Sequence, residues 1–148
     1  MTTGFEIGRD GPSSMLVCVD GSPTSLRASA YAAGLARRQA AELVVVFVNA
    51  GSALANLIPE AGLLANDAQH AVADDLRRQV VDGAKRVGIR ARFVEVKGDA
   101  YTEISRICTD VLADAVIVGA STSAGHRMVG SLGVRLVRAG RWPVTVVP

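Results

Sequence analysis

The sequence predicts an α/β domain built on one open, parallel sheet of five strands with helices on both faces. Short, continuous apolar runs alternate along the chain with amphipathic segments of helical period. Two of the apolar runs end in glycine-containing polar turns, as strands do where an α/β sheet binds ligands. With 148 residues, 49% of them hydrophobic, the chain can bury one core. We therefore expect a single domain over residues 15–148, preceded at 1–14 by a loose tail rich in Gly, Ser, Thr and Pro.

The first strand and helix are predicted from the run at 15–19 and the turn that follows it. A continuous apolar run is typical of a strand covered on both faces. The strand ends at Asp20, Ser22 is suited to cap a helix, and Pro23 fits the first helical position. The helix is predicted to extend to about residue 40. Its inward-facing residues are expected to be Leu26, Ala30, Ala33 and Leu35.

The middle of the chain predicts two further strands, at 43–48 and 89–96, with one helix between them. The second of these strands alternates in part and is expected near the sheet edge. The connection over 49–66 has the length of functional or mobile segments. The helix is predicted at 67–87 and ends at Gly88. Its apolar residues at i+4 spacing are Val72, Leu76 and Val80.

The last part of the chain predicts two strands, at 115–118 and 144–147, each preceded by a helix. Asp99 is suited to cap the first helix, and the second spans 132–139. The apolar positions of the first helix are Ile104, Ile107, Cys108 and Val111. Strands that alternate with helices in this order indicate a Rossmann-like sheet with right-handed crossovers.

Composition excludes several function classes. The net charge is only +2 and the basic residues are scattered among acids, which argues against nucleic acid or an anionic membrane as the main partner. No apolar run has membrane-spanning length and the first residues lack the apolar stretch of a signal peptide, so we expect a cytoplasmic protein. Cys18 and Cys108 fall in apolar surroundings and are interpreted as small buried hydrophobic residues. His70 lies among acids on a helix, where a solvated face is favoured over a metal site.

The stretch at 116–131 carries the strongest functional pattern. A β-branched strand ends at Gly119, a loop of small and polar residues follows, and Gly130 and Ser131 open a helix. Backbone N–H groups at such an N-terminus, together with the helix dipole, favour an anion. Ser131 would donate to a phosphate, cap the helix, or do both. Asp20, at the other strand end, would bind a ribose or adenine, or accept bonds from backbone N–H groups of its own turn.

These features resemble the universal stress protein family. The likeness extends over nearly all of 15–148 and is carried by the segments 17–22, 32–36, 42–44, 117–119, 130–131 and 142–147. The resemblance implies the strand order 3-2-1-4-5, which places the first and fourth strands side by side. It also implies homodimers and a role in regulation, with a regulatory protein partner that the sequence does not name. The last strand is short and apolar, and at a sheet edge it would pair with its copy in a second subunit.

Family members that bind ATP are similar in carrying the motif G-x2-G-x9-G-[ST]. The resemblance therefore implies an adenine nucleotide, ATP or AMP, across Asp20 and Gly119, with Mg²⁺ accompanying ATP. Asp20 and Val48 match the family positions near the adenine and ribose. Gly119 matches the first motif glycine, and Gly130 and Ser131 match the last pair, at the phosphates.

The loop departs from this motif in two ways. Thr122 stands in place of the second glycine, and seven residues, 123–129, precede Gly130 instead of nine. The Cβ of Thr122 disfavours a positive φ, a conformation that Gly125 would supply instead. We expect Arg127 either to compensate by a forked contact with a phosphate or to be an exposed loop residue.

Three functions stay open at this point. The first is a homodimeric regulator that binds an adenine nucleotide. The second is the same fold without nucleotide, acting as a dimeric protein-interaction module, and the shortened loop is the feature that separates the two. The third is a weak ATP hydrolase. The sequence holds neither a P-loop nor a nucleophile elbow, so no catalytic residue is assigned.

Overall fold

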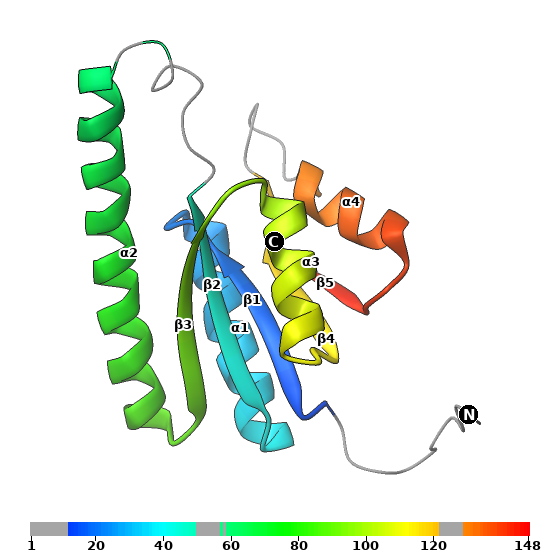
Figure 1. Cartoon of the computed structure of the whole chain (residues 1–148). Helices are drawn as coiled ribbons and strands as arrows, with labels where there is room; N and C mark the ends of the chain where they lie inside the picture. Colours follow the sequence, from blue (N-terminus) through cyan, green and yellow to red (C-terminus); the bar gives the residue numbers. More distant parts are fainter. Residues whose placement is uncertain (1–11, 50–56, 58, 122–128) are drawn as a thin grey trace.

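The fold is an open α/β sheet, seen in a computed structural model that describes residues 12–49, 57, 59–121 and 129–148. Within these residues one parallel sheet runs in the order β3-β2-β1-β4-β5 (Figure 1). Its strands are β1 (Ser14–Val19), β2 (Glu42–Asn49), β3 (Arg90–Lys97), β4 (Ala115–Gly119) and β5 (Val144–Val147). The helices between them are α1 (Pro23–Gln39), α2 (Pro59–Val87), α3 (Ala100–Asp110) and α4 (Ser131–Ala139). The predicted fold class and strand order are therefore confirmed.

The helices cover the sheet in two layers. Side chains alternate along β1, so that Met15, Val17 and Val19 face one layer and Leu16 faces the other. Helices α1 and α2 pack on the first side, and α3 and α4 pack on the second (Figure 1). The chain moves outward from β1 to β3, then crosses back to β4, and this reversal puts the helices on opposite faces. β1 and β4, the pair at the reversal, lie side by side.

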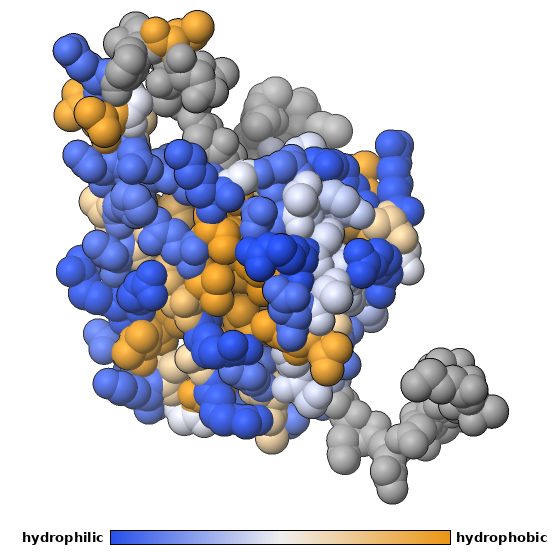
Figure 2. Space-filling model, viewed as in Figure 1, coloured by the Kyte–Doolittle hydropathy of each residue, from blue (hydrophilic) through white to orange (hydrophobic). Residues whose placement is uncertain are grey.

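The cover on the second side is incomplete at the edge strand β3. Helix α3 packs over β2, and the inward side chains of β3 on this face, Val94 and Val96, are only half-buried. Figure 2 shows apolar residues gathered over this part of the sheet, between α2 and α3, with hydrophilic residues around them. β3 accordingly has the mixed burial that its partial alternation predicted.

Two helix caps follow the sequence closely. The Ser22 side chain accepts a hydrogen bond from the backbone N–H of Ser25, and Pro23 opens α1. The carboxylate of Asp99 accepts from the N–H of Thr102 at the start of α3. Both caps bond an N–H group that has no acceptor within its helix.

The predicted inward face of α1 is wrong in part. The buried stripe consists of Ala28, Ala32 and Ala36, whereas Leu26 is 40% exposed and Ala30 is also exposed. Ala33 and Leu35 are half-buried against the core. Apolar residues surround much of this helix, and periodicity alone did not identify the stripe that contacts the sheet. Alanines let α1 lie close to the sheet, which favours that stripe over the larger leucine.

The predicted start of the second helix is wrong as well. α2 begins at Pro59, eight residues before the expected position, so much of the segment at 49–66 is helical. A proline disrupts the interior of a helix but fits its first turn, so Pro59 is compatible with this start. The buried residues of α2 include Ala73 and Leu76, and Val72 is exposed. Among the described residues, no helix combines the length and apolarity needed to cross a membrane.

Candidate functional site

A cleft of about 500 Å³ opens at the carboxyl ends of β1 and β4. This is the place where the strand order reverses, and open α/β sheets bind ligands there. The cleft is bounded by strand ends on one side and by the first turns of α1, α3 and α4 on the other. Each of these turns presents backbone N–H groups and the positive end of a helix dipole. The cleft is therefore suited to an anionic group.

The structure brings together the predicted site residues that it describes. Those that line the cleft are Asp20, Val48, Gly119, Gly130 and Ser131. They come from four different elements and span more than a hundred residues of sequence. Thr122 and Arg127, together with most of the loop that carries them, lie outside the described residues.

Asp20 is held in the turn between β1 and α1. Its Oδ1 accepts a hydrogen bond of 2.8 Å from the backbone N–H of Ser22, and its own N–H donates to Ser25 Oγ at 3.2 Å. Partial burial acts to raise the pKa of Asp20, but the hydrogen bonds from Ser22 and Ser25 outweigh it and leave that pKa below its ordinary value. The carboxylate is thus ionised at neutral pH. The turn interpretation of Asp20 is observed, and the residue also faces the cleft.

Gly119 is required by packing against α1. A Cβ at this position would lie 2.6 Å from the carbonyl carbon of Thr24 and 2.7 Å from the backbone nitrogen of Ser25. Both of those atoms belong to backbone and cannot rotate aside. The glycine therefore allows the end of β4 to lie against the first turn of α1, and both elements line the cleft.

The first turn of α1 adds hydroxyl groups that sequence reasoning missed. Ser22, Thr24 and Ser25 all line the cleft. Ser25 Oγ donates to the backbone oxygen of Ser22 at 2.9 Å, and the hydroxyls of Ser22 and Thr24 lie 3.3 Å apart. The run of small hydroxyl residues directly after a strand end was the available signal, but only the capping role of Ser22 was drawn from it.

The N-terminus of α4 differs from those of α1 and α3, because its N-cap residue is a glycine and has no side chain to cap the helix. Within the described residues, Gly130 is the N-cap and forms no side-chain capping bond. Ser131 is the first helical residue, so its predicted capping role is wrong. Gly130 supplies only its backbone oxygen, which accepts from the N–H of Val134 at 3.0 Å. The N–H groups of the first turn have no acceptor within the helix and border the cleft.

The remaining walls of the cleft are apolar. Val46, Val48 and Val118 line it together with the thiol of Cys18. Burial raises the pKa of that thiol above its ordinary value, so it is protonated at neutral pH. Burial also raises the pKa of Cys108 to about 11. In the described ranges, His, Cys, Asp and Glu side chains form no group of three or more that would hold a metal ion.

Comparison with known proteins agrees with this geometry. A model of the universal stress protein family matches residues 13–148. A universal stress protein from Burkholderia pseudomallei is 24% identical with a TM-score of 0.77, over 92% of this chain and 96% of that one. No curated protein sequence matches the chain.

Two similar structures are described as nucleotide complexes. One is a universal stress protein in complex with cAMP, 22% identical with a TM-score of 0.66, over 93% of this chain and 98% of that one. The other, from Archaeoglobus fulgidus, is in complex with dAMP; it is 18% identical with a TM-score of 0.68, over 91% and 97%. These likenesses concern the fold, whereas the family match extends from Ser13 to the last residue. The chain belongs to the universal stress protein family.

Proposed function

We propose that the cleft binds an adenine nucleotide, with its phosphate at the N-terminus of α4. The glycine N-cap of α4, which has no side chain to bond the N–H groups of the first turn, is the observation that carries this proposal. In α1 and α3 a side chain takes up one N–H of the first turn, while in α4 a phosphate would do so. The cAMP and dAMP complexes of structurally similar proteins support an AMP-type ligand.

The apolar wall would receive the base. Val48 and Val118 line the cleft from the strands β2 and β4, whereas its phosphate-binding end is formed by helix α4. A purine has two apolar faces, and its burial between aliphatic side chains is favourable. Asp20 is ionised and exposed at the rim, where its carboxylate would accept hydrogen bonds from ribose hydroxyls. A volume of about 500 Å³ lies within the range of small-molecule sites.

The role that fits this site is regulation within a cytoplasmic homodimer. β5 is an edge strand, and its four residues are each half-buried. An apolar edge with open N–H and C=O groups would pair with the same strand of a second subunit. Nucleotide binding would then change the surface that a regulatory protein partner contacts. ATP would bring Mg²⁺ with it, coordinated by its own phosphates.

The alternative is a protein-interaction module that binds no nucleotide. Two departures from the family motif favour it. The Cβ of Thr122 disfavours a positive φ in the loop, and the shorter run of residues 123–129 removes two backbone amides that could meet a phosphate. Under the nucleotide proposal, Arg127 compensates for those lost contacts. An Arg127→Ala variant with undiminished nucleotide affinity would rule out that role for the arginine.

A calorimetric titration with AMP, ATP and cAMP tests the proposal when it includes two variants of Ser131. Ser131→Asp places a negative charge in the first turn of α4, which favours the helix but repels a phosphate. Ser131→Asn has nearly the same size and no charge. We expect saturable binding that weakens by about tenfold or more in the Asp variant and much less in the Asn variant.

The outcomes separate the two functions. Binding lost selectively in Ser131→Asp supports a phosphate at α4. Absence of binding for all three nucleotides supports the interaction module. Equal affinity in the Asp and Asn variants would show that the phosphate lies elsewhere.

A further inference from the structure

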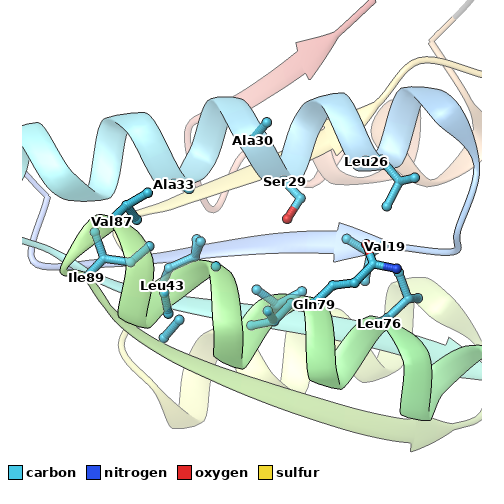
Figure 3. A pocket seen from close by; sticks show the side chains of 15 residues that line it. Val19, Leu26, Ser29, Ala30, Ala33, Leu43, Leu76, Gln79, Val87 and Ile89 are labelled. Atoms are coloured by element: carbon cyan, nitrogen blue, oxygen red, sulfur yellow. The ribbon is translucent and has the colours of Figure 1, made fainter.

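A second hollow, the α1/α2 groove, lies between helices α1 and α2 on the face of the sheet that they cover. It has a volume of about 280 Å³, and Figure 3 shows side chains from α1, α2 and the sheet around it. Its floor includes Val19, Leu43 and Val45 of the sheet. Its walls are mainly apolar, with Ser29 and Gln79 as the polar side chains among the lining residues. Among the described residues, Val19 is the one that lines both the groove and the nucleotide cleft.

The groove exists because small residues face each other across two helices that stay apart. Ala30 and Ala33 line it from α1, and Gly83 and Ala84 line it from α2. Small residues would allow the helices to approach closely, but α1 and α2 pack on the sheet with little contact between them. A Cβ built on Gly83 meets no atom within 4 Å. The space between the helices is therefore apolar and open to solvent.

The charge at one end of the groove indicates the chemistry of its occupant. Arg37 follows Ala33 by four residues, and Arg86 follows Gly83 by three, so both continue the groove-facing sides of their helices. Within the described residues neither guanidinium forms an ion pair. Asp75, which pairs with Arg78, lies toward the other end. The groove thus combines an apolar channel with one basic residue in the last turn of each helix that forms it.

We propose that the α1/α2 groove binds a single-chain aliphatic carboxylate, such as a fatty acid. The hydrocarbon chain lies against Ala33, Val80 and Leu43, and the carboxylate lies between Arg37 and Arg86. A guanidinium binds a carboxylate through two parallel hydrogen bonds. The volume of about 280 Å³ is just below the usual range of ligand sites, which favours one hydrocarbon chain over a lipid with two. Burial of the chain supplies affinity in proportion to the apolar area covered.

The test is a calorimetric titration with decanoate, compared with decanol as a neutral probe of the same length. We expect saturable decanoate binding at one site per chain and at least tenfold weaker binding of decanol. Gly83→Leu would fill the open space and abolish binding of both probes. Gly83→Ala is the matched control, because its single methyl leaves the channel open. Leucine and alanine both favour the helix over glycine, so both variants retain the fold.

The head group is tested by Arg86→Gln against Lys85→Gln. Arg86 lies on the groove side of α2 and Lys85 on the opposite side. We expect decanoate affinity to fall several-fold in Arg86→Gln and to stay unchanged in Lys85→Gln. Equal affinity for decanoate and decanol, binding that persists in Gly83→Leu, or no binding at all would each overturn the proposal. A change from dimer to monomer in Gly83→Leu would also overturn it, because a second copy would then occupy the groove.

Discussion

The cleft at the strand ends and the α1/α2 groove differ in what surrounds them. The cleft is bounded by helix N-termini, hydroxyl groups and an ionised carboxylate, whereas the groove is bounded by the sides of two helices and the face of the sheet. Helix ends carry backbone groups without partners, and helix sides do not. The same sheet therefore provides a polar site at the carboxyl ends of its strands and an apolar site on its face. Substitutions matched between the two hollows test this difference.

The largest effect is expected from alanine substitutions at two glycines, one in each hollow. Gly119→Ala forces a Cβ to within 2.6 Å of α1 backbone, and overpacking of this kind costs about 3 kcal/mol in the free energy of unfolding. Gly83→Ala meets no neighbour and should raise the same quantity by about 0.5 to 1 kcal/mol. Urea unfolding measures both. Equal stability of the two variants would mean that β4 and α1 are not packed as described.

A smaller effect is expected from two serines of α1. Ser22→Ala removes the side chain that caps the helix and should cost about 1 kcal/mol. Ser29 lies in the middle of α1 and lines the groove. Ser29→Ala should change the free energy of unfolding by less than about 0.5 kcal/mol. The comparison is made by thermal unfolding of both variants. A larger loss in the Ser29 variant would place the structural polar contacts in the groove and not at the cleft.

The smallest effect concerns Asp99, which caps α3 beside the cleft. Hydrogen bonds from the N–H of Thr102, then from Arg135 and the Thr102 hydroxyl, lower the pKa of Asp99 to about 2. The folded-state pKa lies below the unfolded one, so the stabilisation is present above about pH 4 and is lost as the pH falls through about 2. Carboxyl NMR shifts follow the titration directly.

Asp99→Asn is the matched control for this pH dependence. Asparagine retains the capping bond but has no proton to gain, so its stability should be flatter between about pH 4 and 2. Identical acid limbs for the variant and the parent protein would contradict the assignment of this titration to Asp99.

The parts that the sequence predicted are those whose signals are local. Ser22, Pro23 and Asp99 define helix starts by their own chemistry, and each cap is observed. The strand order came from the family resemblance, and with it the meeting of Asp20 with Gly119 at one cleft. The errors concern packing. Leu26 and Ala28 are both apolar, and which of them faces the sheet depends on how close α1 lies to β1 and β4.

The unpredicted parts of the site have the same origin. The need for glycine at Gly119 comes from Thr24, almost a hundred residues away, and no local pattern contains that contact. Ser131 looked like a cap because serine is common there, but the backbone places Gly130 at the cap and Ser131 in the first turn. The α1/α2 groove depends on the spacing between two helices, a quantity that hydrophobic periodicity does not report.

The most direct measurement of the central claim is an amide NMR titration of the isotope-labelled protein with AMP. A nucleotide in the cleft would shift the signals of its lining residues first: Asp20, Ser22, Gly119, Gly130 and Ser131. Ala33 and Gly83, in the groove, should remain in place. Shifts centred on the groove, or unchanged spectra at high AMP concentration, would contradict the claim that helix N-termini at the carboxyl ends of the strands hold a phosphate.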